Sequence, residues 1–114
     1  MINNWKSLVL LKDEMSLCRG AWLRFPATYP FEAEIIWMIC ENRLDINFPI
    51  NFITISGDKA AINPVQCLPR ECLHSEGGLS ISWLKLNWKK WVYSECNVDD
   101  VLVKLNPLNV EKII

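Results

Sequence analysis

The sequence has little of the material from which sites for charged or metallic ligands are usually built. It contains a single histidine and four glycines, and its 12 basic and 13 acidic residues leave a formal net charge of −1. A chain with this balance has no overall field that would attract nucleic acid or an anionic membrane surface. It also lacks any run of about 18 apolar residues, so no membrane-spanning helix is predicted.

The N-terminus lacks the features of a secretory signal as well. Residues Met1–Lys6 have neither the charged start nor the small-residue cleavage site that such a signal needs. We therefore expect a cytosolic protein. The five cysteines are an odd number, which favours reduced thiols over a disulfide framework.

What is present is the composition of a globular protein. Apolar residues make up 51% of the chain and charged residues 22%, which excludes a disordered chain. A length of 114 residues is sufficient to bury a core without metal or disulfide support. We expect one domain spanning residues 1–114.

Several short strands are predicted in the first half. Gly20–Phe25 alternates in the manner of a half-buried strand, which Pro26 ends. Glu32–Glu41 is apolar on both alternating sets and fits a central strand or a buried helix, with its β-branched and aromatic content favouring the strand. Ser7–Lys12 fits a strand or one helical turn, and we favour the strand.

The middle of the chain predicts a hairpin and a long loop. Ile50–Ser56 and Lys59–Asn63 are separated by Gly57–Asp58, which suits a tight two-residue turn. The stretch before the hairpin is expected to be irregular or at a sheet edge because it contains Pro49. Pro64–Gly78 is predicted to be a long connection, and such loops are often functional.

The second half predicts one main helix and a last strand. Ser80 is a plausible N-cap for a helix of about twelve residues ending near Tyr93, and Asn97–Leu105 follows as a strand. The fold class expected is α+β, with a mostly antiparallel sheet and one helix, about residues 80–92, packed on one face.

The predicted helix carries three tryptophans within nine residues. At about 100° per residue, one narrow stripe contains Ile81, Leu84, Trp88, Trp91 and Val92. Trp83 points to nearly the opposite side. With Lys85, Lys89 and Lys90 it could stack bases and hold phosphates or rest on a membrane, but the cations do not form one groove, and we favour a solvated helix face.

Thiols and the one histidine suggest two kinds of site. Cys67, Cys72, His74 and Cys96 could bind zinc, but the spacing is not that of a paired zinc knuckle, so no metal or other cofactor is expected. Cys72 and His74 could also form a nucleophile and its base. A polar loop with buried thiols is the simpler interpretation.

Acidic residues occur in three local groups that could meet a basic partner. The groups are Glu32 with Glu34, Glu71 with Glu76, and Asp99 with Asp100. Complementary charge speeds association and sets specificity. Together with Trp83 and His74, these carboxylates are the predicted partner-binding residues.

Several segments carry a resemblance that covers most of the chain. They are Trp22–Pro26, Asn51–Gly57, His74–Gly78, Trp83–Leu84 and Asn87–Tyr93. Together they resemble the small immunity proteins of bacterial polymorphic toxin and contact-dependent growth inhibition systems. These families share no catalytic motif, so the resemblance assigns no functional residue.

The resemblance implies a cytosolic, non-enzymatic protein that forms a tight heterodimer with a cognate toxin domain, commonly a nuclease. It implies no direct binding of nucleic acid or membrane. Surplus tryptophan fits this expectation because tryptophan is enriched at binding hot spots. The alternatives are a small thiol-dependent enzyme using Cys72 and His74, and a nucleic-acid adaptor using the Trp/Lys helix.

Overall fold

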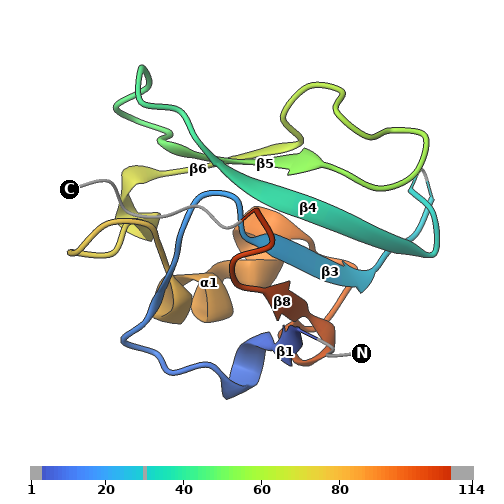
Figure 1. Cartoon of the computed structure of the whole chain (residues 1–114), viewed down its shortest axis with the longest axis horizontal. Coiled ribbons are helices and arrows are strands. Elements are labelled where there is room, and N and C mark those ends of the chain that lie inside the picture. The colour runs from blue at the N-terminus through green and yellow to red at the C-terminus, as the bar shows by residue number, and fades with distance from the viewer. Residues whose placement is uncertain (1–3, 30, 109–114) are drawn as a thin grey trace.

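A six-stranded antiparallel sheet, in the order β1-β8-β3-β4-β5-β6, forms the body of the molecule (Figure 1). The computed structural model describes residues 4–29 and 31–108. The strands of this sheet are β1 (Trp5–Ser7), β3 (Trp22–Pro26), β4 (Glu34–Glu41), β5 (Ile50–Thr54), β6 (Gln66–Leu68) and β8 (Leu102–Lys104). A second sheet pairs β2 (Ser16–Leu17) with β7 (Leu79–Ser80).

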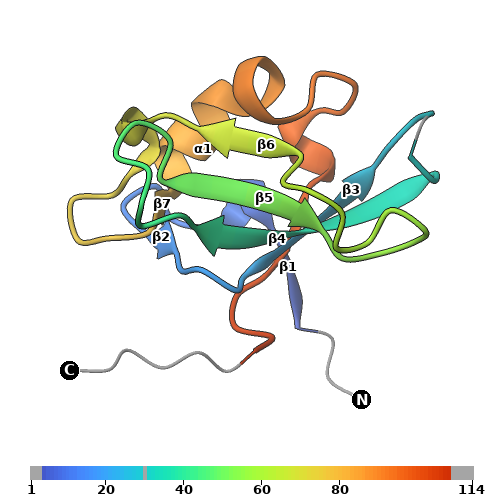
Figure 2. The same cartoon turned by 90° about the horizontal axis from the view of Figure 1, so that it is seen from above.

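One helix covers one face of the large sheet, as Figure 2 shows. It consists of α1 (Ile81–Asn87) and a π-helical turn, η3 (Trp88–Val92). Ser80 is the predicted N-cap, and its hydroxyl accepts a hydrogen bond from the Trp83 N–H at 3.2 Å. The α+β fold expected from the sequence is therefore confirmed.

Three short 3-10 turns complete the described elements. They are η1 (Leu8–Leu10), η2 (Arg70–Cys72) and η4 (Val98–Asp100). None of the helices within residues 4–29 and 31–108 is long and apolar enough to cross a membrane.

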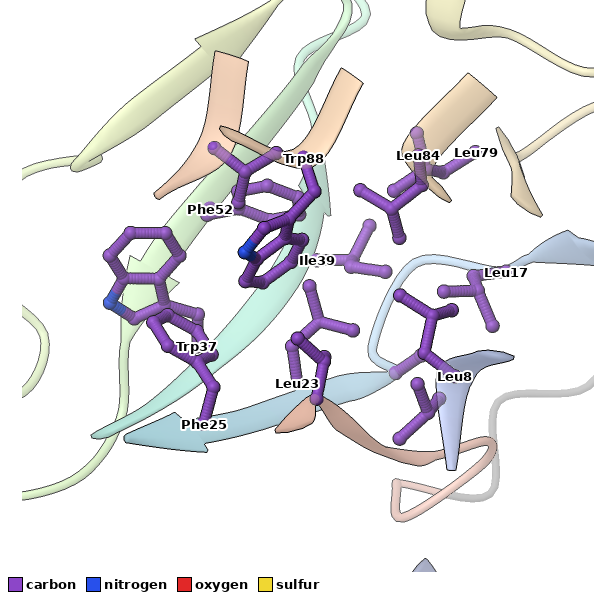
Figure 3. Close-up of a cluster of buried hydrophobic side chains, with 14 of the residues drawn as sticks. Leu8, Leu17, Leu23, Phe25, Trp37, Ile39, Phe52, Leu79, Leu84 and Trp88 are labelled. Atoms are coloured by element: carbon purple, nitrogen blue, oxygen red, sulfur yellow. The ribbon is translucent and has the colours of Figure 1, made fainter. Parts of the chain in front are cut away.

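Aromatic rings join the helix to the sheet. The Trp88 ring meets Phe25 edge to face, with 5.1 Å between centroids, and Phe25 meets Trp37 in the same way at 4.9 Å. Such pairs set the positive edge of one ring against the negative face of the other. Figure 3 shows these side chains between helix and sheet, with Leu84 and Leu8 further along the same core. The core thus continues from the helix to the sheet.

The strand prediction for Glu32–Glu41 is confirmed by the central strand β4. Its inner set of Ile35, Trp37 and Ile39 is buried in the core, whereas Ile36 and Met38 lie half-buried on the opposite face. The strand is central in the sheet, where β3 and β5 flank it. The strand at Gly20–Phe25 is likewise confirmed as β3, which ends at Pro26.

The hairpin prediction is confirmed for its first strand and wrong for its second. β5 forms, but its partner is β6, and Lys59–Asn63 makes turns in place of a strand. The Ala61 N–H binds the Thr54 carbonyl at 2.7 Å and closes a wide loop, and a Glu32 carboxylate oxygen accepts the Asp58 N–H at 3.3 Å. Gly57 has φ +72°, as a turn requires, yet the chain continues turning through Ala61 at φ 63°. The predicted long loop at Pro64–Gly78 therefore contains an edge strand.

The two ends of the chain also correct the sequence predictions. Ser7–Lys12 leaves the sheet after Ser7 and forms the helical turn η1, which the hydrogen bond from the Leu11 N–H to the Leu8 carbonyl closes at 3.1 Å. In the last predicted strand, only Leu102–Lys104 pairs. The preceding Asp99 and Asp100 lie on η4 instead of on a strand.

Candidate partner-binding surface

Cys72 and His74 are not arranged as a nucleophile and its base. Cys72 is fully buried, and burial raises the pKa of its thiol to about 12. His74 Nδ1 accepts the Glu76 N–H at 3.0 Å, so Nε2 carries the proton and donates to the Glu14 carbonyl at 2.7 Å. Both ring nitrogens therefore bind backbone atoms. The histidine ties its loop to the segment before β2.

The other thiols do not gather around His74 either. Cys18 and Cys67 are exposed, Cys40 is half-buried, and Cys96 is buried with its thiol donating to the Asn97 carbonyl. Within the part of the chain that the structure describes, no three of the His, Cys, Asp and Glu side chains are grouped so that they could hold a metal ion.

The Trp/Lys helix does not present one groove of rings and cations. Trp83 packs against the core and lies 6.4 Å from Trp91 between ring centroids. Lys85 is bound inward, with Nζ 2.7 Å from both the Leu11 carbonyl and the Asp13 carboxylate. Lys89 and Lys90 are exposed, whereas the Trp83 and Trp91 rings are half-buried. The helix thus holds one of its lysines inward and keeps both of these rings partly covered.

The three acidic groups lie on different parts of the molecule. Glu32 binds the turn at Asp58, and Glu34 forms an ion pair with Arg24 at 2.8 Å; both stand at the β3–β4 turn. Asp99 borders a shallow open cavity of about 300 Å³ together with Lys85 and Lys89 of the helix. Asp100 follows it on η4.

Glu71 and Glu76 stand at the opposite end of the large sheet from Glu34. Leu68, the last residue of β6, pairs with Ile50, which in turn pairs with Glu41 at the far end of β4. Glu71 is on η2 directly after this end, and both side chains are exposed. The structure thus does not bring the three acidic groups together on one surface.

One surface that the sequence analysis missed is the outer face of the sheet near β1. Trp5 and Trp22 lie 6.3 Å apart, and Lys104 lies over both rings at 5.6 and 5.3 Å. Arg24 lies 5.5 Å from the Trp5 ring and pairs with Glu34. In the predicted strand Gly20–Phe25, Trp22 and Arg24 alternate with the core residues, and this was the signal available in the sequence. The cations are held by rings and a carboxylate within the same face.

A second missed surface is the loop between β4 and β5, residues 42–49. Leu44 is 96% exposed, Ile46 71% and Phe48 40%. Singly exposed apolar side chains are ordinary, but three within five residues form a local apolar patch. In the sequence, Leu44 was expected in a turn, and the alternation that begins with Ile46 and Phe48 indicated only an irregular segment or an edge strand.

Hydrogen bonds hold this loop in one shape. The Asp45 carboxylate accepts the N–H groups of Asn47 and Phe48 at 2.9 and 3.0 Å, and the Asn42 side chain accepts the Leu44 N–H at 3.1 Å. The base of the loop closes through the Asn42 N–H and the Pro49 carbonyl at 2.8 Å. Its apolar side chains are therefore presented on a fixed backbone.

A family model described as Immunity protein 45 matches residues 8–103. The chain belongs to this family. Membership implies a partner toxin protein that the chain neutralises, and it suggests an inhibitor that is not itself an enzyme. No curated protein and no solved structure matches the chain.

Proposed function

We propose that this chain neutralises a cognate toxin domain by binding it tightly as a heterodimer, and that it does so in the cytosol without catalysing a reaction. The observation that carries the proposal is the family match over residues 8–103. In this mechanism the immunity protein covers the toxin's active site or its substrate-binding surface. A stable small fold with exposed, ordered side chains is sufficient for that task.

We further propose that the toxin is a nuclease. Enzymes that act on nucleic acid present basic surfaces to its phosphates. Exposed carboxylates on an inhibitor complement such a surface and accelerate association. Glu71 and Glu76 are exposed and make no ion pair among the described residues, so their charges are available to a partner.

The experiment is co-expression with the toxin domain encoded immediately upstream in the genome. We expect the chain to restore growth of a bacterial host that expresses this domain, and to co-elute with it as a one-to-one complex. The purified toxin domain should degrade DNA or RNA, and the purified chain should stop this degradation. Failure to rescue growth together with failure to form the complex would overturn the proposal.

The thiol-dependent alternative has its own test in iodoacetamide labelling across pH. A pKa of about 12 leaves Cys72 almost entirely protonated at pH 7 to 8, and its thiolate fraction rises only as pH approaches that value. We expect the exposed Cys18 and Cys67 to react at pH 8 while Cys72 does not. Rapid labelling of Cys72 below pH 8 in the folded protein would restore the enzyme hypothesis.

A further inference from the structure

We propose that the toxin docks on the 42–49 loop and on the adjacent carboxylates of Glu71 and Glu76, which we call the acidic rim. The inference rests on the proposed function and names the surface that performs it. The partner surface that fits is an apolar recess bordered by basic side chains.

The apolar centre of this surface consists of the exposed side chains of Leu44, Ile46 and Phe48. Water contact with such side chains is unfavourable, and a partner that covers them gains the free energy of removing that contact. Leu73, which directly follows η2 in the sequence, is 38% exposed. Protein interfaces typically have this plan, with an apolar centre inside a polar border.

The fixed backbone of the loop favours tight binding. Ordering a mobile loop on association costs conformational entropy, and a loop already held in shape avoids most of that cost. Asp45 and Asn42 hold the interior of the loop, and the Asn51 side chain donates to the Phe48 carbonyl at 3.3 Å. The loop is thus organised before the partner arrives.

The acidic rim begins beside the loop, at Glu71, and Glu76 lies further along the same 70–78 segment. The β5–β6 pairing places η2 beside the loop, and Arg70 Nη1 lies 3.5 Å from the Ile46 carbonyl. Figure 1 shows the loop and the 70–78 segment at the same end of the sheet. Neither Glu71 nor Glu76 makes an ion pair within the described residues.

The two segments that form this surface carry more carboxylates than cations, and this balance selects the occupant. Segments 41–49 and 70–76 together contain the carboxylates of Glu41, Asp45, Glu71 and Glu76, and the guanidiniums of Arg43 and Arg70. Arg43 is already paired with Glu41 at 3.3 Å. A second copy of this chain would set like charges against each other, whereas a basic toxin surface would be attracted.

The test compares two pairs of exposed aliphatic positions. Leu44→Asp with Ile46→Asp places charges in the apolar centre. Leu10→Asp with Leu86→Asp does the same at sites that are 83% and 85% exposed but lie on η1 and α1. We expect the first pair to weaken affinity for the upstream-encoded toxin domain at least about 100-fold and the control pair less than about threefold. Melting temperatures should change little in both because the altered side chains are exposed.

Charge reversal tests the rim in the same way. Glu71→Lys with Glu76→Lys should slow association about tenfold at low ionic strength, and added salt should reduce the difference from the wild type. Asp99→Lys with Asp100→Lys is the matched control, and Lys104→Glu probes the outer sheet face. We expect both controls to associate within about threefold of the wild-type rate.

The outcomes separate this inference from the proposed function. If the wild-type chain fails to bind the toxin domain, the proposed function itself is wrong. If the wild type binds and the Leu44/Ile46 variant binds equally well, the function stands and the docking surface is wrong. Loss of binding through Asp99/Asp100 or Lys104 alone would place the interface on η4 or on the outer sheet face.

Discussion

The tryptophan-rich helix and the 42–49 loop both carry apolar side chains, but the helix buries its apolar stripe and the loop exposes its apolar residues to solvent. In the helix, Ile81, Leu84, Trp88 and Val92 are at most 2% exposed and pack against the sheet. In the loop, Leu44 and Ile46 extend into solvent from a backbone held by polar side chains. Tryptophan, which is enriched at interfaces, thus packs in the core of this helix, whereas mainly aliphatic residues form the exposed patch.

This contrast shows that composition alone does not locate a binding surface. A large aromatic side chain binds a partner only if the fold leaves it exposed. The apolar stripe of this helix instead packs against the sheet. A loop with apolar residues that no other element covers has exposed area to offer. The tryptophans and the loop therefore have separable roles, one in stability and one in binding.

Trp88→Ala is expected to have the largest effect, and that effect is on stability. The substitution removes a fully buried ring that contacts Phe25, so the free energy of unfolding should fall by about 3–5 kcal/mol. Chemical denaturation measures this fall, with Leu86→Ala, at an exposed site on the same helix, as control. Under conditions where the variant remains folded, its toxin affinity should equal that of the wild type. A large loss of affinity without loss of stability would reverse the division of roles.

Trp83→Ala should have an intermediate effect, also on stability. Its ring is half-buried against Trp91, so we expect a loss of about 2 kcal/mol in the free energy of unfolding and unchanged toxin affinity. Trp83→Phe retains a ring at the same position and should recover most of the loss. If Trp83→Ala instead weakens binding in a fully stable protein, Trp83 belongs to the interface, as the sequence analysis expected.

Asp45→Ala should have the smallest effect of the three, and on binding. It removes the acceptor of two loop N–H groups, which loosens the loop without altering its apolar side chains. We expect toxin affinity to fall about tenfold, which corresponds to about 1.4 kcal/mol, as measured by calorimetry. Asp45→Asn keeps an acceptor oxygen and should bind nearly as well as the wild type. Equal affinities for the alanine and wild-type proteins would show that loop order is unimportant.

The parts of the fold that follow local periodicity could be predicted from the sequence. Ser80 caps the helix as expected, and β3 and β4 occupy the expected segments. The predicted second strand of the hairpin is wrong, and the turn at Asp58 contacts the Glu32 carboxylate, which lies 26 residues away. A two-residue turn signal contains no information about such a contact.

The binding surface was harder to predict for a related reason. Alternation at Leu44, Ile46 and Phe48 has the same pattern as a half-buried strand, and only the paired sheet shows that no described element covers it. The environment of Trp83 was missed because a uniform α-helical period was assumed. The chain instead adopts a π-helical turn from Trp88, and Trp91 lies beside Trp83.

Amide hydrogen exchange of the free chain and of its toxin complex, at short labelling times, tests the central claim most directly. Local opening dominates exchange on this timescale, so protection reports the contacted segment more than global stability. We predict strong additional protection at residues 42–49 and 70–76 and none at residues 81–92. Protection confined to the tryptophan-rich helix, with the loop unchanged, would contradict the account.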